Sequence, residues 1–305
     1  MPRELILHHY DASPFSEKVR KLFAAKRLPW RAVTQPSIMP KPDLVPLTGG
    51  YRKIPVLQIG ADVFCDTLLV VRTLEWLHPT PTLYPGGTVG TCHAWNLWAD
   101  RLLFQPVVAV VFAEIGQFVP QAFIDDRTRM MPGRDFAELP AMAPSARDQL
   151  RGLVATLESQ LADARPWLLG AAFSLADAAC FHPLWFLRVA PGALGMLDEF
   201  PRTRSWTAAV DALGHGDPSP MEPAEALAVA REAAPAATVA ADARDPAGLA
   251  PGQHVTVVPD DYGFDPVTGE LVFSTPHEVA LRRTDPAVGE VVVHFPRVGF
   301  RVTAG

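Results

Sequence analysis

The sequence predicts three domains in the order α/β, all-α and all-β, and three observations support this. The chain has 305 residues, more than the roughly 250–300 that one hydrophobic core usually holds. Short strand patterns alternate with helix patterns in the first quarter of the chain, and long helix patterns follow. After residue 245 the composition changes to short β runs separated by turn residues. We therefore expect domains at 1–80, 91–235 and 246–305.

Composition and charge exclude several classes of function. Hydrophobic residues make up 49% of the chain and charged residues 20%, which is ordinary for a folded protein. The formal net charge of −6 predicts no nucleic-acid partner and no binding to anionic membranes. The 3 cysteines are far apart in the sequence, which fits neither a disulfide framework nor a cysteine metal site. Because the N-terminus lacks a secretory signal pattern, we expect a cytoplasmic protein.

The first domain opens with a strand, a turn and a helix. Residues 4–9 have a strand pattern, and a helix pattern with one apolar face begins after Ser13. The other elements are expected as strands at 30–33, 54–59 and 63–65, a helix at 67–77, and a proline-broken loop at 35–46. The order is therefore βαβ followed by ββα.

The second domain is expected to be a helix bundle. Its helices are predicted at 91–118, 144–163, 175–189, 201–213 and 222–234. Pro106 should bend the first of them. The longest apolar stretch, 102–115, is shorter than the roughly 20 residues that a membrane span needs, so we interpret it as a buried helix.

The third domain is expected to be a small barrel of the SH3-like kind. Strands are predicted at 255–258, 270–273, 278–281, 290–295 and 300–302. Two Asp-Pro-x-x-Gly segments, beginning at Asp265 and Asp285, predict turns between them.

Four short segments have the chemistry of a binding site or of a buried helix cap. Ser13-Pro14-Phe15-Ser16 follows a strand and starts a helix, whose free N–H groups and partial positive charge can stabilise an anion. A proline opens a strand in Ile54-Pro55, and Asp66-Thr67 lies where a strand meets a helix. Ser174 and Asp177 have the spacing of a capping box at the start of a buried helix.

In this order, the four segments resemble the glutathione S-transferase family from about residue 5 to residue 213. The resemblance implies a thioredoxin-like glutathione-binding domain, a transferase C-terminal-type helical domain and a homodimer. It also implies a cis peptide at Ile54–Pro55, with the Ile54 backbone paired to the cysteinyl part of glutathione. The alternative for Pro55 is a trans proline at an edge strand.

The resemblance assigns glutathione's charged ends to three positions. Asp66 would meet the ammonium group and Thr67 the carboxylate of the γ-glutamyl end. The alternative is that either residue only caps its helix. Lys53, with Arg52 beside it, is the nearest partner for the glycyl carboxylate.

Ser13 is the expected catalytic residue. Its hydroxyl would donate a hydrogen bond to the glutathione thiolate, which then attacks a small hydrophobic electrophile. Ser16 is the second choice and Tyr10 the third, although Tyr10 fits a packing role equally well. Because serine stands at both Ser13 and Ser16, this motif cannot form a mixed disulfide.

Aromatic residues on the first long helix are the expected lining of the electrophile pocket. They are Trp95, Trp98, Phe104 and Phe112, together with Met130 and Met131 on the following connection. The alternative is that these side chains belong to the core. Histidines 8, 9 and 93 lack partners at metal-binding spacing, so we expect no metal.

The β-domain leaves a second function open. Ordinary members of the family lack such a domain, so the chain is either an enzyme or a non-catalytic glutathione-binding scaffold that uses the β-domain to contact another macromolecule. Asp260-Asp261-Tyr262 indicates a cation or partner contact, or else a solvated turn.

Overall fold

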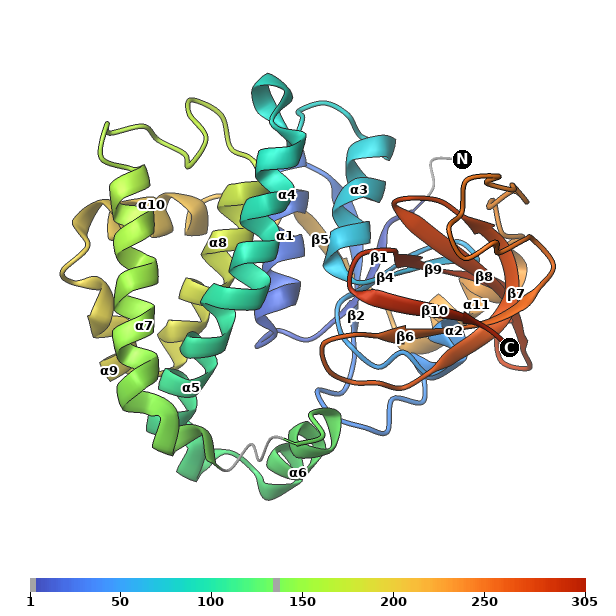
Figure 1. The fold of residues 1–305 in the computed structure, drawn as a ribbon, viewed down its shortest axis with the longest axis horizontal. Coiled ribbons are helices and arrows are strands. Elements are labelled where there is room, and N and C mark those ends of the chain that lie inside the picture. The colour runs from blue at the N-terminus through green and yellow to red at the C-terminus, as the bar shows by residue number, and fades with distance from the viewer. Residues whose placement is uncertain (1–3, 134–137) are drawn as a thin grey trace.

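The computed structural model describes residues 4–133 and 138–305, and Figure 1 shows their arrangement. The elements of the first domain are β1 (Ile6–His9), α1 (Pro14–Lys26), β2 (Pro29–Thr34), α2 (Val45–Thr48), β3 (Val56–Ile59), β4 (Asp62–Cys65) and α3 (Thr67–Leu77). The predicted order is confirmed. The proline-broken segment ends in the single turn α2, which the sequence interpretation missed. Pro46 is tolerated there because a proline in the first helical turn sacrifices no intrahelical hydrogen bond.

The strands of the first domain form a mixed sheet. β1 runs parallel to β2 and antiparallel to β3, and β3 is antiparallel to β4. Every residue of β1 and β3 is buried, because helices and further structure cover both faces of the sheet. An unpredicted strand, β5 (Asp217–Pro220), extends the edge by pairing in parallel with β2.

The second domain is helical, as expected. Its helices are α4 (Val89–Trp98), α5 (Phe104–Ile115), α6 (Gln121–Met130), α7 (Leu139–Gln160), α8 (Leu175–Phe186), α9 (Pro191–Leu194) and α10 (Pro201–Asp211). Single 3-10 turns lie at Pro85–Gly87, Gly116–Phe118, Leu187–Val189 and Gly195–Leu197. By length and composition alone, Val89–Phe118 could cross a membrane, but in this fold it packs against α7 and α8.

The first long helix changes its winding just before Pro106. Between α4 and α5 lies one π-helical segment, η2 (Ala99–Leu103). In a regular helix the Pro106 ring would clash with the carbonyl group of Leu102, and Leu102 lies within this wider segment. The predicted irregularity therefore exists, but it precedes the proline and carries Asp100 and Arg101.

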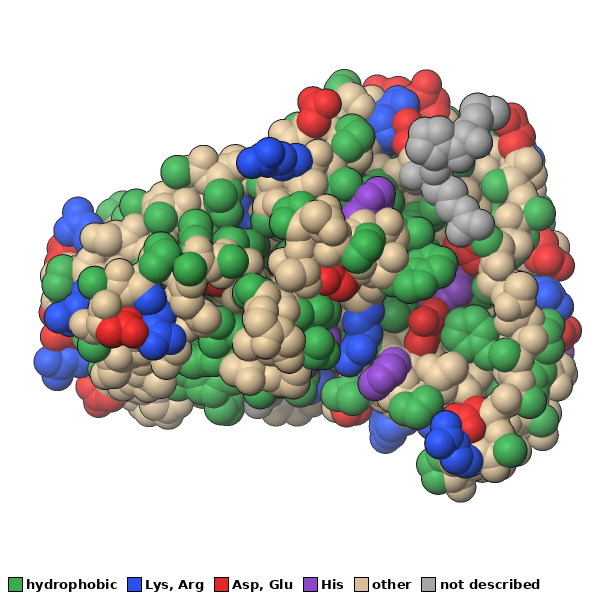
Figure 2. Space-filling view, turned by 90° about the horizontal axis from the view of Figure 1, so that it is seen from above, with side chains coloured by type: hydrophobic (Ala, Val, Ile, Leu, Met, Phe, Trp, Pro, Cys, Tyr) green, Lys and Arg blue, Asp and Glu red, His purple; other side chains and the backbone are tan. Residues whose placement is uncertain are grey.

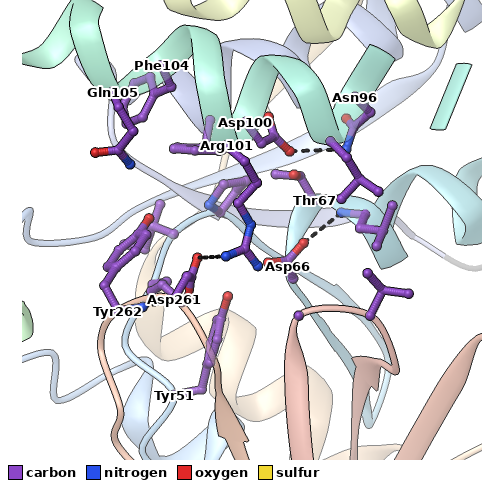
Figure 3. Close-up of a pocket in the computed structure, with 18 of the residues that line it drawn as sticks. Tyr51, Asp66, Thr67, Asn96, Asp100, Arg101, Phe104, Gln105, Asp261 and Tyr262 are labelled. Atoms are coloured by element: carbon purple, nitrogen blue, oxygen red, sulfur yellow. Dashed lines mark hydrogen bonds and ion pairs between the residues drawn. The ribbon is translucent and has the colours of Figure 1, made fainter. Parts of the chain in front are cut away.

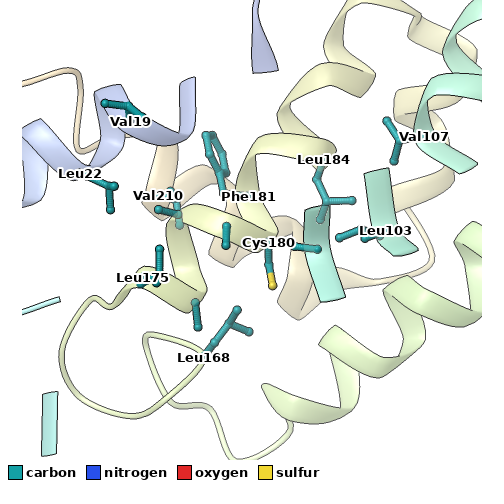
Figure 4. Close-up of a cluster of buried hydrophobic side chains, with 14 of the residues drawn as sticks. Val19, Leu22, Leu103, Val107, Leu168, Leu175, Cys180, Phe181, Leu184 and Val210 are labelled. Carbon is teal, nitrogen blue, oxygen red and sulfur yellow. The ribbon is translucent and has the colours of Figure 1, made fainter. Parts of the chain in front are cut away.

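A shared apolar core joins the first two domains. Figure 4 shows Val19 and Leu22 of α1 facing Phe181 of α8 and Val210 of α10. Each fully buried side chain of this size contributes roughly 1.5–3 kcal/mol. At the start of α8, the Asp177 carboxylate accepts from the backbone N–H of Ser174 at 2.9 Å and from its hydroxyl at 2.7 Å. The predicted capping box is therefore present.

The appended β-domain is confirmed, and it continues the sheet of the first domain. Its strands are β6 (His254–Pro259), β7 (Val267–Ser274), β8 (Glu278–Asp285), β9 (Gly289–Pro296) and β10 (Phe300–Ala304). The strand order of the whole sheet is β10-β6-β7-β8-β9-β4-β3-β1-β2-β5. β9 pairs in parallel with β4, and side chains of both domains share one core.

The helix α11 (Pro223–Glu232) also packs on this sheet. The sequence interpretation placed it in the helical domain, but it contacts β2 and β9. Ala226 packs with Ile6 and Val33, and Ala230 packs in the core shared with the β-domain.

One of the two predicted turns is correct. Asp285 caps the β8–β9 hairpin by accepting from the N–H of Ala287 at 2.9 Å. The prediction at Asp265 is wrong, because the residues that should form the turn begin strand β7. Glycine at position 269 allows strand β8 to approach closely, because an added Cβ would lie 2.7 Å from the carbonyl oxygen of Arg282.

A buried histidine between two carboxylates lies where β4 meets β9. His294 contacts Asp62 at 3.1 Å through Nε2 and Glu278 at 2.6 Å through Nδ1, and the Phe64 ring stacks on it. Burial alone would lower the pKa of His294, but the two carboxylates hold it above the ordinary 6.5. Asp62 also accepts from the N–H of Ala236 at 2.7 Å.

The face seen from above carries mixed charge. Figure 2 shows Lys and Arg side chains interspersed with Asp and Glu over the described part of this face. No broad field of one sign is visible there, in keeping with the modest net charge of −6.

We predict that the junction between β4 and β9 is stabilised by protonated His294. Because its pKa is raised by folding, this contribution is complete below about pH 6.5 and is lost as the pH rises through the folded-state pKa. His294→Gln should lower the free energy of unfolding by about 2–3 kcal/mol at pH 6, and by less at pH 9. Urea denaturation at both pH values measures this.

The exposed His254 of the same domain provides the control. His254→Gln should leave stability nearly unchanged at both pH values. A loss in His294→Gln that does not vary with pH would contradict the prediction.

Candidate functional site

Ser13 caps the start of α1. Its backbone is extended, and its Oγ accepts from the N–H of Ser16 at 3.2 Å. The side chain is buried except where it lines a cavity, and its hydroxyl proton remains available to donate. Ser13 therefore places a hydroxyl group at the positive end of a helix dipole.

The two alternatives to Ser13 lie in different surroundings. Tyr10 lines the same cavity as Ser13, and its carbonyl group accepts from the Ser13 N–H at 3.1 Å. Ser16 is fully buried, its hydroxyl has no hydrogen-bond partner within the described residues, and it lines neither cavity described below. The geometry therefore favours Ser13 or Tyr10 over Ser16.

The Ile54–Pro55 peptide is cis, as the resemblance implies. Both residues line a cavity that Asp66 and Thr67 also line, and Ile54 lines the cavity at Ser13 as well. Within the described residues, the N–H and C=O groups of Ile54 make no hydrogen bond. A bound peptide can therefore pair with this backbone as a strand would.

Asp66 and Thr67 start α3 at the cavity wall. Asp66 caps the helix by accepting from the N–H of Leu68 at 2.8 Å, with a φ of 73° that non-glycine residues rarely adopt. Burial raises the pKa of Asp66, and Lys53 only partly offsets this. Thr67 is buried beside it and lines the same cavity. Asp66 therefore caps α3 and lines the cavity at the same time.

The two cavities adjoin each other. The one at Asp66 and Thr67 has a volume of about 320 Å³, and the one at Ser13 has a volume of about 660 Å³. Both are lined by Phe15, Lys53, Ile54, Phe104, Gln105, Met131 and Tyr262. The three predicted motifs of the first domain therefore face one continuous site, the smaller part of which Figure 3 shows.

A buried polar cluster links α1 to the helical domain at the smaller cavity. Lys18 of α1 donates to Asp100 at 2.8 Å and to Asn96 at 3.1 Å. His182 lies 3.0 Å from Asp100. Burial alone would raise the pKa of Asp100, but Lys18 and His182 hold it below its usual value. The same burial lowers the pKa of His182 to about 4, so Lys18 is the cation of this cluster.

The two cations predicted for the glycyl carboxylate already have acidic partners. Lys53 pairs with Asp261 of the β-domain at 2.7 Å, and its Nζ lies 4.3 Å from the centre of the Tyr262 ring. Arg52 pairs with Asp126 of α6. Both still line the larger cavity, so they contribute charge to it as neutralised pairs.

Lys41 is a cavity residue that the sequence interpretation missed. It is 3% exposed, lines the larger cavity, and its ammonium group has no hydrogen-bond partner among the described residues. Burial and the nearby Arg127 and Arg52 lower the pKa of Lys41 to about 7. A lysine within a proline-rich loop gives no sequence signal for this, because Arg127, which helps to lower its pKa, lies far away in the sequence.

The apolar wall of the larger cavity differs in part from the prediction. Phe104 and Phe112 line it, as do Met130 and Met131. Trp95 and Trp98 line neither cavity and instead pack edge to face at 5.2 Å, so their assignment to the pocket is wrong. They lie on α4, whereas the cavity faces α5. The other apolar residues that line it are Val108, Ile115, Val119, Ala122, Phe123, Leu139, Phe186 and Val189.

The Asp260-Asp261-Tyr262 segment lies at the site rather than in a solvated turn. Asp261 and Tyr262 line the smaller cavity, and Figure 3 shows both facing the α4–α5 side of the site. Asp260 pairs with Arg101 of η2 at 2.9 Å. The sequence could not reveal this, because the partners lie more than a hundred residues earlier in the chain.

The three histidines that were considered as ligands have other partners. His8 lies 2.8 Å from the Gln58 side chain, His9 lies 3.2 Å from Arg20, and His93 lies 3.0 Å from the Tyr84 hydroxyl. Among residues 4–133 and 138–305, no group of three His, Cys, Asp or Glu residues could hold a metal ion.

Comparison with known proteins identifies the family. A family model described as "Glutathione S-transferase, N-terminal domain" matches residues 7–82, and one described as "Glutathione S-transferase, C-terminal domain" matches residues 113–209. A GST-like protein from Pseudomonas syringae is 39% identical, with a TM-score of 0.84, over 99% of this chain and 100% of that one. The chain belongs to the glutathione S-transferase family.

Other transferase structures match the common part of the fold. A glutathione S-transferase from Rhodospirillum rubrum has 21% identity and a TM-score of 0.53 over 68% of this chain and 88% of its own. Rice GST1, whose structure is a complex with glutathione, has 22% identity and a TM-score of 0.51 over 74% of this chain and 93% of its own. The Pseudomonas syringae match covers 99% of this chain, so it includes the β-domain. No curated protein matches the sequence.

We predict that Lys41 titrates near neutral pH in this transferase-family protein. Its pKa is lowered to about 7, so it should lose its proton between pH 6 and pH 8. Nuclear magnetic resonance of the protein labelled with ¹³C-lysine measures this as one Cε signal that moves over that range. Lys41→Gln should remove the signal. The prediction fails if every lysine signal is constant up to pH 8.

Proposed function

We propose that the protein binds glutathione and stabilises its thiolate for attack on a small hydrophobic electrophile. One observation carries this proposal: Ser13, the Ile54 backbone and the Asp66-Thr67 pair line two adjoining cavities, of which the smaller is about as polar as it is apolar and the larger is mostly apolar. A tripeptide thiol and an apolar second substrate can then meet at the start of α1.

The charged groups favour one direction for the tripeptide. Asp66 suits the ammonium group of the γ-glutamyl end, and the Thr67 hydroxyl suits its carboxylate. The Ile54 backbone then faces the cysteinyl residue. At the other end, Lys41 has no acidic partner among residues 4–133 and 138–305, and it therefore suits the glycyl carboxylate. A bound carboxylate would stabilise its protonated form.

The chemistry follows from the start of α1. A free thiol has a pKa of about 8.5, so it is mostly protonated at neutral pH. The Ser13 hydroxyl and the helix dipole would favour the thiolate, with the proton passing to solvent. The sulfur then forms a bond to the electrophilic carbon, and the leaving group departs with the electron pair of the bond that breaks.

The structure favours this reading over two others. Cys65, Cys92 and Cys180 are all buried and line neither cavity, which argues against thiol–disulfide exchange at this site. The β-domain contributes side chains to the site itself, which favours a part in substrate binding over the scaffold alternative. The homodimer and the cytoplasmic location remain predictions from the sequence.

Ser13 is tested by the acidity of bound glutathione. Calorimetry should show binding to the wild type, and ultraviolet titration of the complex should show a thiol pKa below that of free glutathione. Ser13→Ala should raise the bound thiol pKa by about one unit, equivalent to about 1.4 kcal/mol, with a smaller change in affinity.

Ser16→Ala is the matched control, because Ser16 lies on the same helical turn but outside both cavities. It should leave the thiol pKa unchanged. Absence of glutathione binding by the wild type would refute the proposed function. An unchanged thiol pKa in Ser13→Ala would refute the role of Ser13.

Asp66 is tested with a ligand that lacks the ammonium charge. Asp66→Asn should weaken glutathione binding by about 2 kcal/mol, because a charged hydrogen bond is lost. N-acetylglutathione should bind the wild type more weakly than glutathione does, and it should bind the variant and the wild type about equally. Calorimetry of the wild type and of Asp66→Asn, each with glutathione and with N-acetylglutathione, gives the coupling energy between Asp66 and the ammonium group. A coupling energy of zero would show that Asp66 does not meet the ammonium group.

A further inference from the structure

The β-domain reaches into the site through the loop that follows β6, residues 260–264. Three contacts with the other two domains hold this loop. Asp261 pairs with Lys53, Asp260 pairs with Arg101, and the Gly263 N–H donates to the Met130 carbonyl at 2.7 Å. The approach to α6 is close, since a Cβ at Gly263 would lie 3.1 Å from the Met130 side chain. The loop is therefore a fixed part of the site wall.

Tyr262 lies at the centre of this loop and lines both cavities. The ammonium group of Lys53 lies 4.3 Å from the centre of its ring, and Asp261 holds that ammonium group. Figure 3 shows the Tyr262 hydroxyl directed toward the helix that carries Phe104 and Gln105. The ring is thus oriented while the hydroxyl group faces the place where the cavities meet.

The Tyr262 hydroxyl is an unused donor. Within residues 4–133 and 138–305 it makes no hydrogen bond, although the ring is mostly enclosed. Burial raises the pKa of Tyr262, and the negative charges of Asp261 and Asp66 raise it further, so the hydroxyl keeps its proton. A partly enclosed hydroxyl without a partner is unfavourable unless a ligand or water accepts from it.

We propose that Tyr262 of the appended β-domain is a catalytic hydrogen-bond donor to the electrophile. This inference rests on the proposed function, because the electrophile meets the glutathione thiolate in the larger cavity, which Ser13 and Tyr262 both line. The Ser13 hydroxyl donates a hydrogen bond to the sulfur, and the Tyr262 hydroxyl donates one to the acceptor atom of the second substrate. The β-domain then supplies part of the reaction site.

The chemistry of the donor specifies the class of electrophile. The wall formed by Val108, Phe112 and Phe186 suits an apolar body, and one phenolic hydroxyl suits one acceptor oxygen such as a nitro or carbonyl oxygen. When the sulfur bonds to an activated ring carbon, an electron pair moves from the ring onto a nitro oxygen. Tyr262 donates a hydrogen bond to that oxygen without losing its proton. The electron pair then returns from the nitro oxygen to the ring, and the halide leaves with the electron pair of the carbon–halogen bond.

The test compares Tyr262→Phe with wild type, using glutathione and 1-chloro-2,4-dinitrobenzene. This change keeps the ring and its contact with Lys53 and removes only the hydroxyl group. We expect kcat to fall about threefold to tenfold, the equivalent of one neutral hydrogen bond. The affinity for glutathione and the pKa of its bound thiol should be unchanged. Tyr84→Phe is the matched control, since Tyr84 contacts His93 away from both cavities.

A binding measurement tests the inference independently of turnover. Tyr262→Phe should bind S-(2,4-dinitrophenyl)glutathione about threefold to tenfold more weakly than wild type does, and S-hexylglutathione, which lacks the acceptor, equally well.

The two proposals fail in different ways. If the wild type binds glutathione but Tyr262→Phe matches it in kcat and in affinity for the dinitrophenyl conjugate, only the role of Tyr262 is overturned. A raised thiol pKa in Tyr262→Phe would also overturn it, by showing that Tyr262 acts on the sulfur. If the wild type does not bind glutathione, the proposed function falls and this inference falls with it.

Discussion

The parallel pairing of β4 with β9 is the constraint on which the arrangement of the site depends. β4 ends at Cys65, directly before Asp66 and Thr67, so the strand that leads into the smaller cavity also holds the β-domain. Backbone hydrogen bonds fix the register of a strand pair, since a shift by one residue turns every side chain to the opposite face. The position of the β-domain relative to α3 is therefore set by the sheet itself, and the loop after β6 reaches Lys53 from a fixed direction.

Two ion pairs, each with a largely buried lysine side chain, also fix the positions of the domains relative to one another. Lys18 connects α1 to Asp100 of η2, and Lys53 connects the first domain to Asp261. Buried ion pairs add little net stability, because desolvation offsets most of the attraction. Removing one partner is costly, however, since the other charge is left unpaired in a poor solvent for ions. Such pairs therefore fix the relative position of the domains more than they strengthen the fold, and both of these lie at the cavity that contains Asp66.

The features that the sequence predicted are formed by residues close together in the chain, and the features that it missed are formed by residues far apart in the chain. The helix start after Ser13, the cap that was the alternative role of Asp66 and the Ser174–Asp177 capping box are formed by residues a few positions apart, so local patterns indicated them. Lys53 and Asp261 are separated by more than two hundred residues, and no local pattern marks such a pair.

The errors on helices and turns have the same cause. The aromatic residues of the first long helix predicted both Trp95 and Phe112 as pocket lining, but the pattern could not show that only the α5 part of this helix lines the larger cavity. The turn predicted at Asp265 failed because the residues from Val267 to Gly269 pair with β6, and this strand pairing overrides the local preference of Asp-Pro-x-x-Gly.

The distribution of charge along the site gives its two ends different preferences. In the smaller cavity, Asp100 has Lys18 as its partner and Asp261 has Lys53, which leaves Asp66 as the acid that no side-chain cation of the described part of the chain contacts directly. Of the cations that line the larger cavity, Arg52 and Arg127 both pair with Asp126, which leaves Lys41 without an acidic partner among the described residues. A ligand with an ammonium group at one end and a carboxylate at the other is therefore favoured in one direction and disfavoured in the reverse. In the favoured direction, the middle of the ligand passes the Ile54 backbone and the start of α1, where a thiol could be ionised.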